Sequence, residues 1–311
     1  METTTPIETN QAPKMPERTL VLRERFHYPI ALFPKDVASD IQALDTFVTY
    51  CFRLIDLSPT STDAKRKLTE CKRDIEARTS RHQEISDFNR VRKNHSLPDE
   101  YIALFFEGLS EEISTRQFPS HFDYLRYCYK VSSIPILMVF HIFEAPEASL
   151  PFAIDLGIAL ELTRMAQEIG ADAAKDKFYL AEELVRPDKL ILGLKKDPVW
   201  ELAILRMQRQ QFESADRYLE SAVGGISLLT PDGWIPFLYL ARTCRLAGER
   251  TLNLPTNYLL IPYRISLLDK LKAFMYARSQ KKVFAALGER ECAHDSELHI
   301  ALSGLPGAHQ Y

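Results

Sequence analysis

Apolar residues recur at helical spacing along most of this 311-residue chain. Between residues 36 and 57 they fall three or four positions apart, which places them on one face of a helix. They are Ile41, Leu44, Phe47, Val48, Cys51, Phe52 and Ile55. The same periodicity predicts helices over residues 99–115, 122–143, 151–172, 198–223, 234–248 and 265–287. Because no stretch alternates with a period of two for long enough to form a sheet, we expect an all-α bundle of long antiparallel helices around a central cavity.

Local signals place the ends and kinks of these helices. Pro151 and Pro198 open two of them, since proline is favoured in a first helical turn. The segment 122–143 is apolar nearly all round, so we expect a buried helix with a kink at Pro135. Residues 1–18 are rich in Thr, Pro and Glu and predict a flexible tail. We interpret residues 19–290 as a single all-helical domain and residues 291–311 as a C-terminal tail.

The charge balance excludes some partners and leaves others open. With 39 Lys and Arg against 42 Asp and Glu, the net charge is −3. A nucleic-acid partner is not expected, because nucleic-acid binders usually have a strongly basic domain. Residues 61–95 carry ten Lys and Arg against six Asp and Glu. This excess is typical of a solvated helix and loop, and a docking surface for phosphate or lipid headgroups is the sharper alternative.

Cysteine spacing and the N-terminal sequence bear on the compartment. The five cysteines are widely spaced, and neither they nor the scattered histidines show zinc-ligand spacing. We therefore expect free thiols in a reducing compartment. The first 18 residues lack the apolar core of a signal peptide, and the longest apolar run, 134–140, is far shorter than the roughly 20 residues that span a bilayer. These features predict a cytoplasmic protein, with peripheral membrane contact through an apolar helix face left open.

Motifs for nucleotide binding, serine hydrolases and zinc proteases do not occur in the sequence. The best candidate site is a helix face on which Arg164, Glu168 and Asp172 follow one another four residues apart. Two carboxylates at this spacing repel each other, and a magnesium ion would turn that repulsion into ligation by hard oxygens. The plainer interpretation is an exposed stripe in which Arg164 pairs with Glu168.

Three segments in order resemble the squalene/phytoene synthase family of head-to-head prenyl synthases. Residues 156–164 read LGIALELTR and are followed by Glu168, Asp172, Lys177 and Tyr179, as in the family's second aspartate-rich motif. Residues 127–131 read YCYKV and resemble the family's YCYRV. The helix that ends at Asp56 resembles the one that carries the family's first motif, DDxxD. The resemblance covers about residues 28–275 and implies an isoprenoid-synthase-like helical bundle around a central cavity.

The resemblance also implies roles for particular residues. In the family, two acidic motifs face each other across the cavity and hold Mg²⁺, which grips an allylic diphosphate. This assigns Asp56, Glu168 and Asp172 as metal ligands, with Asp172 also among the catalytic residues. Tyr127 matches a tyrosine that lines the reaction cavity and is the second catalytic candidate. The candidate diphosphate contacts are Arg53, Arg164, Lys177 and Tyr179.

The sequence departs from the family at the acidic motifs. Residues 52–56 read FRLID, so Asp56 alone remains of DDxxD. In the second motif Arg164 stands where the family has Asn and Glu168 where it has Asp. Two added guanidiniums, Arg53 and Arg164, would repel Mg²⁺. They are suited either to bind diphosphate directly, because arginine makes bidentate phosphate contacts, or to close the site with buried salt bridges.

Two functions follow from this pattern. The first is a divergent prenyltransferase that ionises one allylic diphosphate of the farnesyl or geranylgeranyl class. It would pass the prenyl cation to an acceptor, such as an aromatic ring or a second prenyl substrate, rather than form squalene or phytoene. The second is a non-catalytic family member that kept the fold, lost the metal and acts as a binding or assembly protein.

Overall fold

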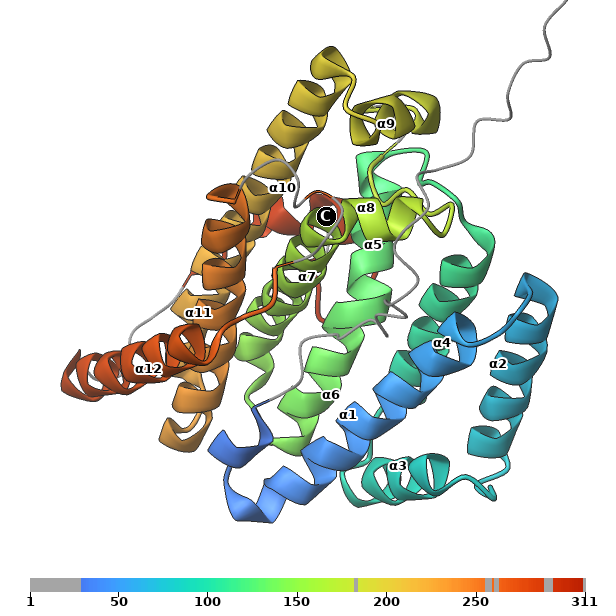
Figure 1. The fold of residues 1–311 in the computed structure, drawn as a ribbon. Helices are drawn as coiled ribbons and strands as arrows, with labels where there is room; N and C mark the ends of the chain where they lie inside the picture. Colours follow the sequence, from blue (N-terminus) through green and yellow to red (C-terminus); the bar gives the residue numbers. More distant parts are fainter. Residues whose placement is uncertain (1–28, 182–183, 255–258, 260–262, 288–292, 310–311) are drawn as a thin grey trace, which may run out of the picture.

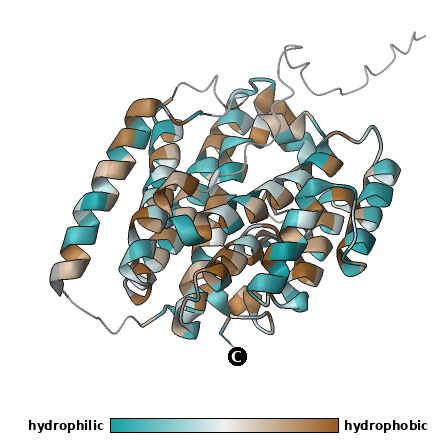
Figure 2. Ribbon diagram, turned by 90° about the horizontal axis from the view of Figure 1, so that it is seen from below, coloured by the Kyte–Doolittle hydropathy of each residue, from teal (hydrophilic) through white to brown (hydrophobic). Residues whose placement is uncertain are grey.

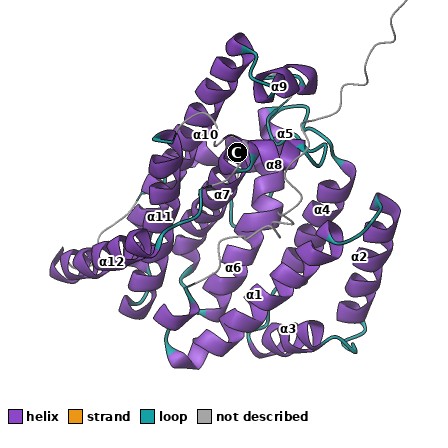
Figure 3. Cartoon of the chain, in the orientation of Figure 1, coloured by secondary structure: helices purple, strands orange, loops and turns teal. Residues whose placement is uncertain are grey.

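The computed structural model describes residues 29–181, 184–254, 259, 263–287 and 293–309. These residues form helices, and their one β-type pairing is an isolated bridge between Gln117 and Phe178 (Figure 3). In chain order the helices are α1 (Lys35–Asp56), α2 (Ser61–Glu76), α3 (Gln83–Asn94), α4 (Asp99–Ser114), α5 (His121–Cys128), α6 (Ile134–Ile142), α7 (Leu150–Gln167), α8 (Ile169–Ala173), α9 (Pro187–Leu194), α10 (Pro198–Gly225), α11 (Pro231–Leu252) and α12 (Leu267–Leu287). The predicted all-α fold is confirmed. The tail predicted for residues 1–18 lies outside the described residues.

Two predicted helices are each divided. The segment 122–143 consists of α5, a π-helical turn (Tyr129–Ser133) and α6, and Pro135 lies in the first turn of α6. The π turn brings Ser133 against α7, where its hydroxyl donates to the Ile154 carbonyl at 2.7 Å. Gly157 permits this approach, because a Cβ there would lie 2.3 Å from the Cα of Ser133. The segment 151–172 is divided at Glu168 into α7 and α8.

Helix α7 lies at the centre of the bundle (Figure 1). It contacts α10 and α11 on one side and α5, α6 and the π turn on the other. Every residue from Phe152 to Gln167 is buried, including the charged Asp155, Glu161 and Arg164. Along the outer helices hydrophilic and hydrophobic residues alternate, as expected when one face meets solvent (Figure 2). The core therefore sits around α7, and the polar residues of α7 lie within it.

The C-terminal segment packs onto this core. Residues 296–302 form a short 3₁₀ helix, and Leu298, Leu302 and Leu305 belong to the same hydrophobic cluster as α1 and α7. The Arg126 guanidinium of α5 donates to the Ala301 carbonyl at 3.1 Å. Residues 293–309, which lie within the predicted C-terminal tail, thus contribute to the core of the bundle.

The four cysteines within the described region, Cys51, Cys71, Cys128 and Cys244, form no disulfide, as predicted, and all four are buried. Burial raises the pKa of Cys244 to about 12, so its thiol stays protonated at neutral pH. Cys292 lies outside the described residues. None of the helices that the structure describes is long and apolar enough to cross a bilayer.

Asp40 ties α1 to α3 and gives a test of the fold by acid. Its carboxylate accepts from Arg90 at 2.6 Å and lies 2.8 Å from His95 Nε2. Burial alone raises the pKa of Asp40, but the contacts with His95 and Arg90 outweigh burial and lower this pKa. A lowered folded-state pKa stabilises the fold above the unfolded-state value, about 3.9, and the stabilisation is lost as pH falls.

We expect Asp40→Asn to lower the free energy of unfolding by about 1–2 kcal/mol at neutral pH, because a hydrogen-bonded charge is lost. The difference from the wild type should shrink as pH falls below about 4. Urea unfolding at several pH values measures it. Asp87→Asn is the matched control, since Asp87 accepts only an exposed hydrogen bond from Gln83 among the contacts described. A pH-independent difference would contradict this account.

Candidate active site

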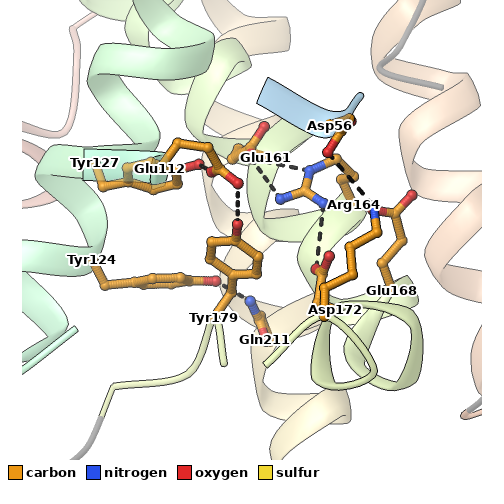
Figure 4. Close-up of polar contacts among 11 residues, drawn as sticks. Asp56, Glu112, Tyr124, Tyr127, Glu161, Arg164, Glu168, Asp172, Tyr179 and Gln211 are labelled. Carbon is orange, nitrogen blue, oxygen red and sulfur yellow. Dashed lines mark hydrogen bonds and ion pairs between the residues drawn. The ribbon is translucent and has the colours of Figure 1, made fainter. Parts of the chain in front are cut away.

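Arg164 lies in the last turn of α7 among three carboxylates (Figure 4). Its guanidinium contacts Glu161 at 2.9 Å, Glu168 at 2.5 Å and Asp172 at 3.5 Å. All four side chains are buried. The predicted grouping of Arg164, Glu168 and Asp172 is therefore present, but as a buried ion-pair cluster instead of an exposed stripe.

The break at Glu168 makes this cluster possible. In an unbroken helix Arg164 and Asp172 would be separated by roughly 12 Å along the axis, too far for one guanidinium group to contact both acids. Glu168 instead leaves the helical conformation, with φ −101° and ψ 13°, and α8 starts with a new direction. Asp172 is thereby brought back to the Arg164 group that Glu168 also contacts.

The first motif meets the second through a lysine. Asp56, at the end of α1, lies 3.6 Å from the ammonium of Lys175, which follows α8. Arg53, one turn earlier on α1, is exposed. Phe52 is buried, and its ring meets the Phe105 ring at 6.0 Å. The position at which the family has its first aspartate is thus occupied by a core phenylalanine, whereas Asp56 faces the second motif.

The charges of this cluster bear on its fit to a metal. The carboxylates of Asp56, Glu161, Glu168 and Asp172 with the cations of Arg164 and Lys175 leave a net charge of −2. Carboxylate oxygens suit Mg²⁺, which protein sites usually bind through one or two carboxylates plus water and substrate phosphate. One divalent cation would neutralise the cluster. Before substrate binds, a second divalent cation would leave excess positive charge, so the residues of the free site fit a single Mg²⁺.

A tyrosine pair lies beside the cluster. The hydroxyls of Tyr127 and Tyr179 both donate to the buried carboxylate of Glu112 on α4, the latter at 2.5 Å. The two rings stack with centroids 6.0 Å apart, and the Arg164 guanidinium carbon lies 5.3 Å from the Tyr179 centroid. Of the two predicted site residues, Tyr179 therefore meets Arg164, and Tyr127 joins it through the stacked rings and the shared contact with Glu112.

Lys177 has a different set of contacts from the one predicted. Its ammonium donates to the carbonyls of Glu112 at 2.5 Å and Thr115 at 2.6 Å, at the C-terminal end of α4. Helix C-termini carry partial negative charge, so a cation is stabilised there. In this conformation Lys177 fastens α4 to the segment after α8. Its role as a diphosphate contact stays a prediction.

A small pocket extends from Arg164 into the bundle between α1, α6 and α7. Its volume is about 40 Å³, room for one water and far less than the 300–1,000 Å³ typical of ligand sites. Its lining mixes polar and apolar side chains and comprises Asp45, Val48, Thr49, Val131, Ser132, Pro135, Ile136, Leu160, Glu161 and Arg164. A prenyl chain along this path needs the surrounding side chains or helices to move apart.

Sequence reasoning missed three residues of the site. Glu112 carried a readable signal, because it follows Phe105 and Leu109 on the apolar face of a helix, where an acid needs a partner. Glu161 stands within the LGIALELTR segment, three residues before Arg164, and this spacing places both side chains on one face of the helix. For Lys175 no local pattern indicated a contact, since its partner Asp56 lies on α1.

Comparison with known proteins agrees with this geometry. The fold is that of isoprenoid synthases: a crystal structure of a dehydrosqualene synthase in complex with ligand aligns with TM-score 0.70 and 20% identity, covering 84% of this chain and 92% of that one. A sequence profile described as squalene/phytoene synthase matches residues 23–264. The chain belongs to the squalene/phytoene synthase family.

Curated relatives align over a shorter part. The 15-cis-phytoene synthase of Enterobacter agglomerans is 30% identical over 140 residues, which are 45% of this chain and 48% of that protein. The phytoene synthase of Pseudescherichia vulneris is 28% identical over 145 residues, 46% of this chain and 47% of that one. The matched region therefore spans about half the length of these relatives.

Removal of the central cation tests the cluster. We expect Arg164→Met to lower the free energy of unfolding by about 3–5 kcal/mol, because three buried carboxylates lose their partner. Added Mg²⁺ should restore part of this loss, since a divalent cation can replace the guanidinium among carboxylate oxygens. Urea unfolding with and without Mg²⁺ measures both effects.

Arg116→Met is the matched control. Arg116 pairs with Asp176 at 2.6 Å, but both side chains are exposed, so the loss should stay below about 1 kcal/mol. An equally small loss for Arg164→Met would contradict the buried ion-pair cluster. Absence of a Mg²⁺ effect would contradict the metal fit.

Proposed function

We propose that this protein is a prenyltransferase that acts on one allylic diphosphate of the farnesyl or geranylgeranyl class. The observation that carries the proposal is the convergence of Asp56 from the first motif with Glu168 and Asp172 from the second, around Arg164 and Lys175. In the reaction the carbon–oxygen bond of the substrate breaks and pyrophosphate leaves. An electron pair of the acceptor then forms a bond with the prenyl carbon, and the acceptor loses a proton.

The cations of the cluster are suited to the diphosphate. A guanidinium makes paired hydrogen bonds with phosphate oxygens, and an entering diphosphate would compete with Glu161 and Glu168 for Arg164. Lys175 is half-exposed and Arg53 is exposed on the adjacent turn of α1, so both can approach the same group. Glu168, once released from Arg164, would join Asp56 and Asp172 in holding Mg²⁺, which would neutralise charge on the leaving diphosphate.

The tyrosine pair is suited to stabilise the prenyl carbocation that forms when the diphosphate leaves. Aromatic faces attract cations, and the Arg164 guanidinium already lies over the face of Tyr179. The Phe118 ring, 4.8 Å from that of Tyr127, extends this aromatic wall. Glu112 fixes both phenol groups, so the rings need no reorganisation when a carbocation forms. The apolar part of the pocket, lined by Val48, Ile136 and other residues, would exclude water.

The charge of the cluster favours one ionised substrate over two. Ordinary squalene or phytoene formation must activate two diphosphates in succession, for which the family uses a fuller set of aspartates. A net charge of −2 supports one divalent cation. Transfer to an aromatic ring, or to a second prenyl substrate that keeps its diphosphate, requires the site to ionise only one diphosphate.

The test is release of pyrophosphate from farnesyl and geranylgeranyl diphosphate, with and without Mg²⁺, and with cell extract as a source of acceptor. We expect Mg²⁺-dependent release by the wild type. Asp172→Asn should slow it by about 10²- to 10³-fold, the range seen when one electrostatic contact to developing charge is removed. Asp188→Asn, at a partly exposed acid on α9, is the control and should leave the rate unchanged.

The ion pairs of Arg164 favour a second candidate. With three carboxylates around it, the guanidinium satisfies the cluster without any metal. A non-catalytic family member that serves as a binding or assembly protein would need no more than this. Calorimetry that detects no binding of either diphosphate, together with no pyrophosphate release, would support this alternative and contradict the prenyltransferase proposal.

Helix α12 supports the proposed peripheral membrane contact. It exposes Leu267, Leu268, Leu271 and Met275, which share one face at three- and four-residue spacing. Lys272 lies beside this face, Arg278 and Lys282 continue it toward the end of the helix, and all three are exposed. An exposed apolar patch next to basic side chains suits the surface of a bilayer that contains anionic lipid.

We expect the protein to sediment with vesicles that contain phosphatidylglycerol, and less so at high salt, because screening weakens the basic contacts. Leu271→Asp with Met275→Asp should reduce the bound fraction severalfold, since charge would replace apolar surface. Val199→Asp, at an exposed apolar position on α10, is the control. Equal loss of binding in the control would show that α12 has no special role.

A further inference from the structure

Three of the eight histidines meet at a buried aspartate of α7, far along that helix from Arg164. His294 Nε2 lies 2.8 Å from Asp155 Oδ2, and His299 Nε2 lies 3.1 Å from Oδ1. His309 Nε2 lies 2.9 Å from His294 Nδ1. Asp155 and His299 are fully buried, and His309 is partly exposed. The sequence did not indicate this cluster, because Asp155 and His294 are 139 residues apart.

Asp155 sets the orientation of two imidazoles. An ionised carboxylate accepts hydrogen bonds and has none to give, so the Nε2 atoms of His294 and His299 carry the protons. Their Nδ1 atoms then carry lone pairs that point away from Asp155. The lone pair of His294 faces His309 Nε2, and His299 Nδ1 lies 3.4 Å from the His309 backbone nitrogen.

This arrangement is the one that metal-binding histidines usually have. A histidine ligand normally donates its second ring nitrogen to a carboxylate or carbonyl, which fixes the tautomer and the ring orientation. One potential ligand nitrogen of each ring lies within 4.8 Å of the others. In a tetrahedral site with metal–nitrogen bonds of 2.0–2.1 Å, the nitrogens lie about 3.3 Å apart. Small rotations of the side chains would close the difference.

We propose that His294, His299 and His309 bind one divalent transition-metal cation of the zinc class, with Asp155 as the outer carboxylate that orients two of the ligands. A fourth position, on the side of the partly exposed His309, would be taken by water. This site is separate from the Arg164 cluster, because nine residues of α7 span roughly 13 Å. The ligands differ as well, since imidazole nitrogens select zinc and carboxylate oxygens select magnesium. The metal would fasten the C-terminal segment to α7.

The test is zinc binding by the untagged full-length protein after removal of metal with a chelator. We expect calorimetry and elemental analysis after dialysis to give one zinc per chain. His309→Gln should weaken binding by about tenfold or more, and Asp155→Asn by about 10- to 100-fold, the range found for outer partners of metal ligands. His82→Gln, at an exposed histidine just before α3, should bind zinc as the wild type does.

Two measurements distinguish a metal site from a histidine cluster that is held by hydrogen bonds alone. Zinc should raise the melting temperature and protect the C-terminal segment from proteolysis in the wild type and in His82→Gln, but not in His309→Gln. Co²⁺ in the wild type should give the visible absorption of a four-coordinate nitrogen site, which decides the question even if a variant fails to fold. No zinc bound by the wild type, or equal affinity in His309→Gln, would overturn the proposal.

Discussion

Complete burial of α7 is the constraint on which the rest of the structure depends. Three of its buried residues, Asp155, Glu161 and Arg164, carry ionisable groups. Charge inside a core is tolerated only where it is paired and hydrogen-bonded. The neighbouring segments satisfy this requirement: α8 supplies Asp172 to Arg164, and the C-terminal segment supplies imidazoles to Asp155. One helix thereby determines where both polar clusters of the molecule lie.

The same constraint links the altered motifs to each other. Phe52 turns its ring into the core instead of adding a carboxylate to the cavity. With two acids fewer at the end of α1, less positive charge is needed, and Arg164 and Lys175 supply it from the protein itself. The loss of aspartates and the gain of cations are therefore two parts of one electrostatic balance, in keeping with the single Mg²⁺ of the proposed function.

Much of the fold could be predicted from the sequence because the long helices are amphipathic or uniformly apolar. The interruptions were harder to predict. The break at Glu168 has no proline or glycine at that residue to announce it, and the short α9 gives too few turns for periodicity. Of the candidate site, Arg164, Glu168 and Asp172 could be grouped by local spacing. The contacts of Lys175, Lys177 and the C-terminal histidines join residues distant in sequence, and no local pattern encodes them.

Stability alone does not account for the Arg164 cluster. Replacing buried ion pairs by apolar residues of similar size is often neutral or stabilising. A bundle that needed only to fold would therefore be as stable with apolar residues in the last turn of α7. Here four carboxylates and two cations meet instead beside a stacked tyrosine pair. The proposed function gives these groups a use, because the charged groups suit a diphosphate with Mg²⁺ and the aromatic faces suit a carbocation. This use is the physical reason to propose a site that binds and ionises such a substrate over a structural remnant.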